Sequence, residues 1–235
     1  MLPAVAVAIG LLVHGVSLRT VRELLIPVAL LGSTPLFLAA HPDFTPNTFK
    51  EFIDYANKLG KPITFASSGV GSDGHLMGEA IALATKIKVE HVPYRSTSQA
   101  LTDVVAGHVA FSTLTLSSTA QFLRAGTITG IAVTSPERMP DNPEIPTFRE
   151  LGYPELVGTT WFSLSGPAKL PADIVQKLNA EITRIVALPD VQARLRRDGF
   201  IAQPMNPAQF TKFVDDENKR WKPLIEAAGL AGKGG

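Results

Sequence analysis

The stretch Lys61–Thr85, KPITFASSGVGSDGHLMGEAIALAT, decides the fold. It begins with a short apolar run of strand type, Ile63–Ala66, and from His75 onward its apolar residues recur at helical spacing. Between the two lies Ser67–Gly74, whose glycines and serines let the backbone turn sharply and let a ligand approach the main chain. A strand that enters a helix through such a turn leaves N–H groups and the positive end of the helix dipole directed at one point. The stretch therefore predicts a site for a small anion.

Strands and helices alternate on both sides of this stretch. An amphipathic helix is predicted before it, from Phe49 to the stop at Gly60. The strands predicted after it, separated by helical segments, are Lys88–Tyr94, Val109–Leu116 and Gly130–Thr134. A proline-rich surface excursion, Ser135–Pro154, then leads to a strand at Thr160–Leu164 and to three further helices. Such alternation predicts an α/β fold with mostly parallel sheets.

Composition excludes several classes of partner. The 235 residues carry a net charge of +1 and only 18% are charged, so no broad field exists to attract nucleic acid or an anionic membrane. The absence of cysteine excludes disulfides, thiolate metal sites and a cysteine nucleophile. The apolar run Met1–Val13 lacks the preceding basic residues of a secretory signal and is shorter than the roughly 20 residues of a membrane span. We expect a buried helix or strand there and no direct membrane insertion.

The central loop also contains a literal G-x-G-x-x-G, Gly69–Gly74, which is typical of the turn that seats a dinucleotide pyrophosphate. Glu90 lies at about the distance required of a ribose-binding carboxylate, but it falls inside its strand rather than at the carboxyl end. Three interpretations are open: a connecting turn without a ligand, a nucleotide-dependent α/β enzyme, or capture of an anion by serine hydroxyls and N–H groups. The two serines before Gly69 favour the third.

The sequence lacks the common catalytic and metal-binding patterns. Ser72 has Gly74 two residues after it but Val70 two residues before it, so a nucleophile elbow is incomplete. His75 belongs to the same helical turn as Ser72 and cannot act as a separately supported base. The five histidines form no H-x-x-x-H pair. We therefore expect no catalytic residues, no cofactor and no bound metal.

Six segments share their order and spacing with the members of a known family. They are PVALLGSTPLFLAAHP from Pro27, ASSGVGSDGHLMGE from Ala66, HVPYR from His91, ALTDVVAGHV from Ala100, AVTSPERMPDNPEIPTFRELG from Ala132 and TWFSLSGPAKLP from Thr160. From about Val28 to Leu230 the chain resembles the substrate-binding receptors of tripartite tricarboxylate transporters, also called the TctC or Bug family.

This resemblance implies a two-lobed fold of the type II periplasmic-binding-protein class. Such a receptor is periplasmic and is not an enzyme. It closes on a small organic carboxylate, which could be a di- or tricarboxylate, an aromatic acid or an acidic amino acid, and presents it to membrane permease subunits. The first lobe would comprise residues 1–44 and 159–235, and the second would comprise residues 45–158.

The resemblance also implies where the ligand binds. The implied ligand-binding residues, in two loops of the second lobe, are Ser67, Ser68, Gly69, Val70, Gly71, Ser72, His75, Thr113 and Thr115. Leu114 and Thr115 stand where the family usually carries an acidic or amide residue. Selection of the ligand's far end is therefore expected to differ from the usual pattern.

Family members begin with further strand and helix units, including a proline-glycine-glycine loop that supplies an opposing anion site. The first 25 residues of this chain match little of that region. We therefore expect the first lobe to be incomplete, with an exposed sheet edge. Either carboxylate affinity is weak or another chain covers the edge; a truncated remnant that binds no ligand is the remaining alternative.

Overall fold

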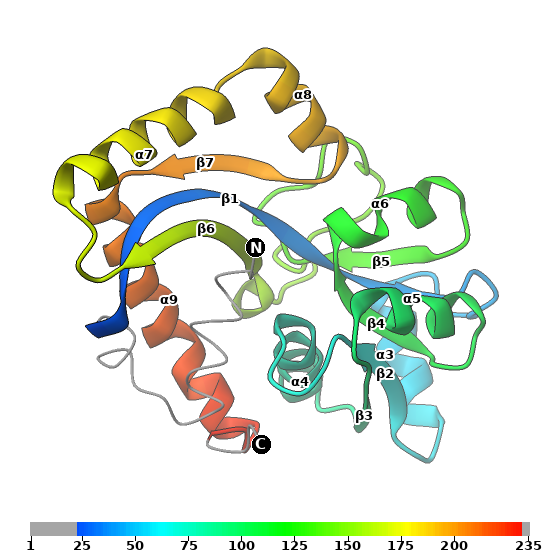
Figure 1. Cartoon of the computed structure of the whole chain (residues 1–235). Coiled ribbons are helices and arrows are strands. Elements are labelled where there is room, and N and C mark those ends of the chain that lie inside the picture. The colour runs from blue at the N-terminus through cyan, green and yellow to red at the C-terminus, as the bar shows by residue number, and fades with distance from the viewer. Residues whose placement is uncertain (1–22, 232–235) are drawn as a thin grey trace. The chain divides into compact units, whose positions relative to one another are not determined.

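A computed structural model describes residues 23–231 (Figure 1). The helix or strand expected at Met1–Val13 lies outside the described residues. The chain divides into two compact units, of which Pro35–Thr159 is one and the residues on either side of it form the other. The division falls after Thr34, whereas the family resemblance implies a first boundary at 44/45.

The difference arises from β1 (Leu25–Ala40), a single strand that contributes to both units. The sequence indicates two apolar runs parted by the turn-like residues Gly32–Pro35. The strand is continuous there because Gly32 has no side chain, and a Cβ at this position would lie 2.2 Å from the carbonyl oxygen of Ile201. The last residues of the strand, Leu36–Ala40, pair with strands of the central unit and therefore belong to it.

The central unit alternates strands and helices as the sequence predicts. Its elements after β1 are α3 (Phe49–Lys58), β2 (Ile63–Ser67), α4 (Asp73–Thr85), β3 (Val89–Pro93), α5 (Thr97–Val105), β4 (Phe111–Thr115), α6 (Leu116–Arg124), β5 (Thr129–Val133) and the short 3-10 helix η1 (Pro154–Leu156). Hydroxyl side chains fix three helix starts. Thr48, Ser72 and Ser96 each accept a hydrogen bond from a backbone N–H in the first turn of α3, α4 and α5.

The strand order in this unit is β3-β2-β4-β1-β5 (Figure 1). Strand β2 is parallel to both β3 and β4, whereas β1 is antiparallel to β4 and to β5. Strand β5 therefore runs in the same direction as β4, and β1 is the reversed strand of the five. The predicted, mostly parallel α/β sheet is confirmed. Because parallel strands end at one edge, the loops after β2, β3, β4 and β5 all lie at that edge.

Apolar side chains cover both faces of the sheet. On one face the rings of Phe65 and Phe111 stack with centroids 5.5 Å apart, and Phe52 meets Phe111 edge-on at 5.0 Å. On the other face Leu114 belongs to a cluster contributed by β1, β2, α5, α6 and β5. Each face removes large hydrophobic side chains from water, which is the main source of the unit's stability.

One polar group is buried in this core without a partner. Ser112 of β4 is fully buried, and its hydroxyl makes no hydrogen bond within residues 23–231. We expect Ser112→Ala to raise the free energy of unfolding by about 1 kcal/mol, because it removes an unpaired buried hydroxyl. Urea denaturation measures the change. Ser96→Ala, which removes the cap of α5, should shift stability in the opposite direction, and an unchanged or lower stability for Ser112→Ala would contradict the assignment.

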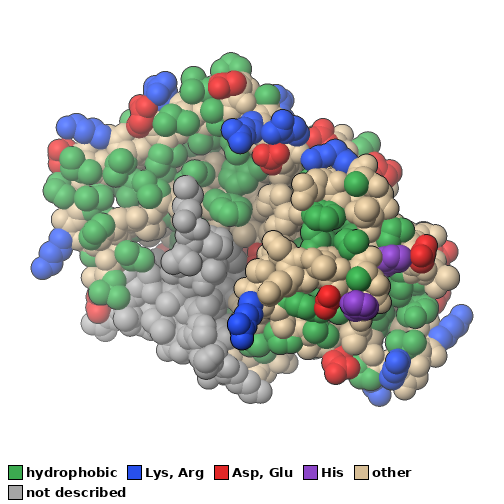
Figure 2. Space-filling model, turned by 45° about the vertical axis from the view of Figure 1, so that its right-hand side comes forward, with side chains coloured by type: hydrophobic (Ala, Val, Ile, Leu, Met, Phe, Trp, Pro, Cys, Tyr) green, Lys and Arg blue, Asp and Glu red, His purple; other side chains and the backbone are tan. Residues whose placement is uncertain are grey.

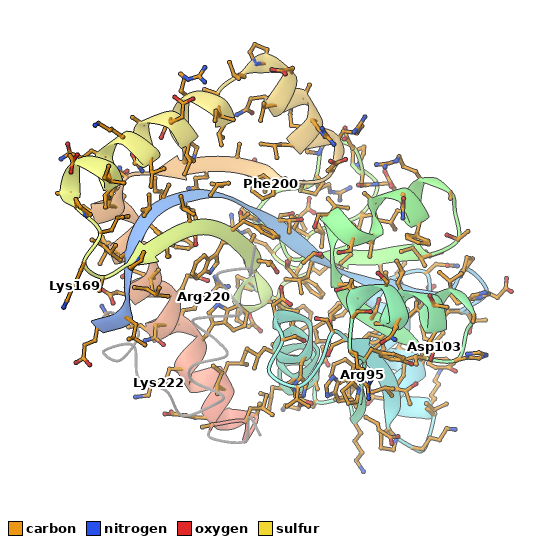
Figure 3. All side chains as sticks on the ribbon, in the orientation of Figure 1. Arg95, Asp103, Lys169, Phe200, Arg220 and Lys222 are labelled. Atoms are coloured by element: carbon orange, nitrogen blue, oxygen red, sulfur yellow. The ribbon has the colours of Figure 1, made fainter. Side chains whose placement is uncertain are left out.

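The second unit consists of the first part of β1 together with further strands and helices. Its other elements are β6 (Thr159–Pro167), α7 (Ala172–Val186), α8 (Pro189–Arg197), β7 (Ile201–Met205) and α9 (Pro207–Ala227). The sequence pattern does not predict β7, because its residues IAQPM include a proline and few apolar side chains. The strand forms because Leu30 of β1 pairs with Met205, and the ring of Phe200 (labelled in Figure 3) lies 5.5 Å from that of Phe162.

Candidate functional site

The predicted anion loop lies at the carboxyl edge of the central sheet. It follows β2, and α4 begins directly after it with Ser72 as N-cap. The carboxyl end of β4 lies beside the start of α4, because the Thr113 hydroxyl donates a hydrogen bond of 2.5 Å to the carbonyl oxygen of Gly74. A Cβ on Gly74 would lie 2.3 Å from the Thr113 carbonyl oxygen, so only glycine permits this approach. The structure therefore brings together the two segments that the sequence analysis had assigned to one site.

Two of the three loop serines are turned inward. The Ser67 hydroxyl accepts from the Gly69 N–H at 3.2 Å and lies 2.7 Å from Nε2 of His91. The Ser72 hydroxyl donates to the Gly69 carbonyl at 2.8 Å and accepts from the His75 N–H at 3.2 Å. Both hydroxyls therefore shape the loop, which the sequence alone does not show.

Glycine is required at two positions of the loop. Gly69 has φ +125° and Gly71 has φ +74°, a region that residues with side chains rarely adopt. The Ser72 N–H donates to the Gly69 carbonyl at 3.2 Å, which closes the turn between them. The main chain thereby turns from the end of β2 into the first turn of α4.

The groups left at the surface of the loop are few. The N–H groups of Gly69, Gly71 and Ser72 all donate within the protein. Val70 is 51% exposed and Ser68 is half-buried, and the structure gives neither the Ser68 hydroxyl nor the Val70 N–H a partner among residues 23–231. These are the loop donors positioned to meet a ligand.

The N-terminus of α4 is satisfied locally. Asp73 accepts from the Gly74 N–H at 2.8 Å, and burial raises the pKa of the Asp73 carboxyl. At the start of α6, Thr115 makes no side-chain cap, because its hydroxyl lies 2.8 Å from that of Ser118. Of these two neighbouring helices, α6 thus begins without a capping hydrogen bond from the side chain of its N-cap residue.

Two stacked histidines form hydrogen bonds with residues of the loop. The rings of His75 on α4 and His91 on β3 stack with centroids 3.7 Å apart and planes 11° apart. Nδ1 of His75, a buried residue, accepts a hydrogen bond from the Gly71 N–H at 3.0 Å, and its Nε2 lies 3.7 Å from a Glu79 oxygen. Sequence reasoning assigned His75 to the site but missed His91, since their contact depends on how α4 packs on the β3 strand.

The environment of His91 holds its imidazole neutral. Burial and then the neighbouring His75 lower the pKa of His91 from 6.5 to about 4, against a smaller opposing effect of Glu79. Between pH 4 and pH 6.5, His91 therefore binds fewer protons in the folded protein than in the unfolded chain.

The free energy of unfolding should therefore decrease as the pH is lowered from 6.5 to about 4. Between pH 6.5 and pH 4 the unfolded state takes up the His91 proton first, so the free energy of unfolding decreases as the pH drops. We expect a loss of about 2 kcal/mol from this group, allowing for the partial exposure of the ring. Urea denaturation at a series of pH values measures it. His91→Gln cannot titrate and should lose less over the same window; an equal slope in both proteins would contradict the assignment.

Glu90 does not reach the mouth of the loop. The parallel register pairs Glu90 with Thr64, whereas Ser67 at the end of β2 pairs with Pro93. A ribose-binding carboxylate is required at the carboxyl end of its strand. The register therefore favours anion capture over the dinucleotide interpretation of Gly69–Gly74.

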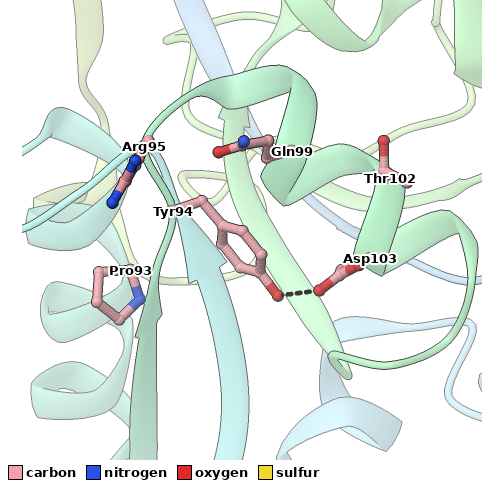
Figure 4. Close-up of a pocket in the computed structure, with 6 residues that line it drawn as sticks. All are labelled: Pro93, Tyr94, Arg95, Gln99, Thr102 and Asp103. Carbon is pink, nitrogen blue, oxygen red and sulfur yellow. Dashed lines mark hydrogen bonds between the residues drawn. The ribbon is translucent and has the colours of Figure 1, made fainter.

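A polar pocket of about 510 Å³ lies between the end of β3 and α5 (Figure 4). Tyr94 donates a hydrogen bond of 2.5 Å to Asp103, and Arg95 and Gln99 contribute to the same wall (Figures 3 and 4). Burial and the Asp103 carboxylate raise the pKa of Tyr94 to about 12. The Tyr94 N–H also donates to the Ser67 carbonyl at 3.0 Å, so this wall is joined to the anion loop. No pattern in the sequence indicates the tyrosine–aspartate pair.

Two other expectations concern charge and metals. Acidic and basic side chains are interspersed on the face shown in Figure 2, in keeping with the net charge of +1. Within residues 23–231 no cluster of histidine and carboxylate side chains could hold a metal ion. In the same range, none of the helices combines the length and the apolar character needed to cross a bilayer.

Solved proteins with this fold are periplasmic solute-binding proteins. The periplasmic binding protein BugD superposes with a TM-score of 0.81 at 28% identity, covering 88% of this chain and 70% of that one. MatC (Rpa3494) from Rhodopseudomonas palustris, solved with bound malate, gives a TM-score of 0.79 at 30% identity, covering 86% and 69% of the two chains. The fold of this chain is thus that of the periplasmic-binding class.

Sequence comparison identifies the family. Residues 12–230 match the tripartite tricarboxylate transporter family receptor, and the chain belongs to this family. The UPF0065 protein in the tcbD-tcbE intergenic region of Pseudomonas sp. (strain P51) is 32% identical over 201 residues, which are 85% of this chain. The chain spans 60% of the length of that relative. The resemblance stated from the six sequence segments is confirmed.

Proposed function

We propose that this protein is a periplasmic receptor that binds a small organic carboxylate and delivers it to the permease of a tripartite tricarboxylate transporter. The observation that carries the proposal is the contact of Gly74, in the first turn of α4, with Thr113, near the carboxyl end of β4. That contact places the uncapped start of α6 beside the anion loop. A carboxylate is the small anion best suited to such donors.

Within the site, we assign different roles to the predicted residues. The Ser68 hydroxyl and the Val70 N–H contact one carboxylate, which lies near Thr115 at the start of α6. The residues that hold the loops in shape are Ser67, Gly69, Gly71, Ser72, His75 and Thr113. The unit Pro35–Thr159 is the lobe that carries this site.

The ligand class is supported by the relatives. MatC was solved with malate, a dicarboxylate, and shares the fold of this chain at 30% identity. No observation on the described residues favours a nucleotide, because Glu90 lies away from the end of its strand. The receptor function thus needs no chemistry beyond binding and release.

A thermal-shift screen of the purified chain tests the proposal. The panel comprises malate, adipate, citrate, benzoate, aspartate, glutamate and NAD. A ligand that binds only the folded state stabilises it by about 2.7 kcal/mol at a hundredfold excess over its Kd. We expect stabilisation by at least one carboxylate, reduced by Ser68→Ala and retained in Ser98→Ala, an exposed serine outside the site. Stabilisation by NAD alone, or by none of the panel in a cooperatively folded sample, would contradict the proposal.

A further inference from the structure

The stacked histidines hold the two ends of the anion loop. His75 accepts the Gly71 N–H through Nδ1 at 3.0 Å, and His91 meets the Ser67 hydroxyl through Nε2 at 2.7 Å. Ser67 is the last residue of β2, and Gly71 immediately precedes the N-cap of α4. The pair therefore contacts both the entrance and the exit of the turn that carries Ser68 and Val70.

The hydrogen bond donated by Gly71 determines which nitrogen of the His75 ring carries the proton. A backbone N–H can only donate, so Nδ1 of His75 must present a lone pair and the ring proton must lie on Nε2. Nε2 faces Glu79, whose oxygen lies 3.7 Å away and favours a proton there. A proton on Nδ1 would abolish the Gly71 contact.

Uncharged neighbours of the pair favour a neutral His91 ring, whereas the Glu79 carboxylate opposes this effect. From β2 the pair faces the Phe65 ring, 4.9 Å from His91 and 6.2 Å from His75, and the uncharged Ser67 hydroxyl. From α4 it faces the carboxylate of Glu79. Two stacked imidazolium rings 3.7 Å apart would repel each other, so at most one ring can gain a proton easily.

We propose that His75 and His91 are positioning residues for ligand binding, which keep the anion loop in its binding shape only while both rings are neutral. His75 orients the Gly71 peptide, and with it the neighbouring Val70 N–H, while His91 holds the Ser67 hydroxyl that accepts from Gly69. Protonation of His75 at Nδ1 releases the Gly71 peptide and lowers carboxylate affinity. This inference rests on the proposed receptor function for its ligand, but not for its effect on the loop.

Replacing each histidine with asparagine or glutamine distinguishes the loss of its hydrogen bond from the loss of side-chain volume. In His75→Asn the side-chain oxygen can take the place of Nδ1 and accept from Gly71, whereas in His75→Gln the amide lies near the position of Nε2 and cannot. For His91 the order reverses, since the contact to Ser67 is made by Nε2 and His91→Gln is the conservative replacement. Each histidine thus has a matched pair of variants of similar polarity.

The first readout needs no ligand. Hydrogen exchange measures protection of the Gly71 amide, and ¹⁵N NMR reports the protonation of the His75 ring in the same sample. We expect protection to fall at least tenfold in His75→Gln, to be retained in His75→Asn, and to disappear in the wild-type protein along the titration curve of His75. Equal protection of Gly71 in all three proteins, or an Nδ1–H tautomer of His75, would overturn the proposal.

The second readout is affinity for malate and adipate by titration calorimetry. We expect His75→Gln and His91→Asn to bind at least tenfold more weakly than the wild-type protein, and His75→Asn and His91→Gln to stay within about threefold of it. Equal losses in all four variants would assign the pair a purely structural role and overturn the proposal. If the Gly71 amide responds as expected but no carboxylate binds the wild-type protein, the receptor function fails while the control of the loop by the histidines stands.

Discussion

Replacing Gly74 with alanine is expected to lower the free energy of unfolding by about 3 kcal/mol and to weaken carboxylate binding. The new Cβ would lie 2.3 Å from the Thr113 carbonyl oxygen and 3.4 Å from the Ser67 Cβ. Because the obstacle is a backbone atom of β4, no side-chain rotation relieves it, and the start of α4 must move away from the sheet. That movement breaks the bond from the Thr113 hydroxyl to the Gly74 carbonyl and separates the two halves of the proposed site.

The expected sign is opposite to that of an ordinary helical glycine. At an unobstructed position in a helix, alanine is more stable than glycine by about 1 kcal/mol. Ala82→Gly, within the same helix, supplies this baseline and should lose about that amount. Urea denaturation and calorimetry with malate measure both variants. A Gly74→Ala protein as stable as the wild type would show that α4 does not need the close approach to β4.

Local composition was enough to predict the strand, turn and helix of the central stretch. The apolar run before Ser67 and the helical spacing after Ser72 placed the turn within a residue or two of its observed limits. The position of Glu90 relative to the loop became clear only from the pairing of β3 with β2 in the structure. The residues of a strand do not by themselves show where the strand ends. Elements with strong local signals were therefore predictable, and strands defined by their partners were not.

The interior of the site depended on contacts that no local pattern encodes. His75 and His91 are far apart in the chain, and their stacking follows from the packing of α4 against the sheet. The same packing turns the hydroxyls of Ser67 and Ser72 inward, although their sequence context suggested direct ligand contact. Residue type indicated the chemistry of the loop, whereas the direction of each side chain came from tertiary structure.

The boundary of the central unit shows the same limit. The family resemblance implies that the second lobe begins at residue 45. In the structure, Leu36 and Gly158 lie near the two ends of the unit, and both form a hydrogen bond with the hydroxyl of Thr134, directly after β5. Long-range hydrogen bonds of this kind define the unit, and one threonine supplies two of them.

Thr134→Val is accordingly expected to lower the free energy of unfolding by about 4 kcal/mol, because two buried backbone groups lose their partner at once. The Thr134 hydroxyl accepts from the Leu36 N–H at 2.9 Å and donates to the Gly158 carbonyl oxygen, and its side chain is fully buried. Valine has nearly the same shape, so the loss reports the hydrogen bonds rather than a cavity. Thr134→Ser keeps the hydroxyl and removes one methyl group, which should cost about 1 kcal/mol. Urea denaturation of both variants decides the matter: equal losses would mean that the hydroxyl contributes nothing to joining the ends of the unit.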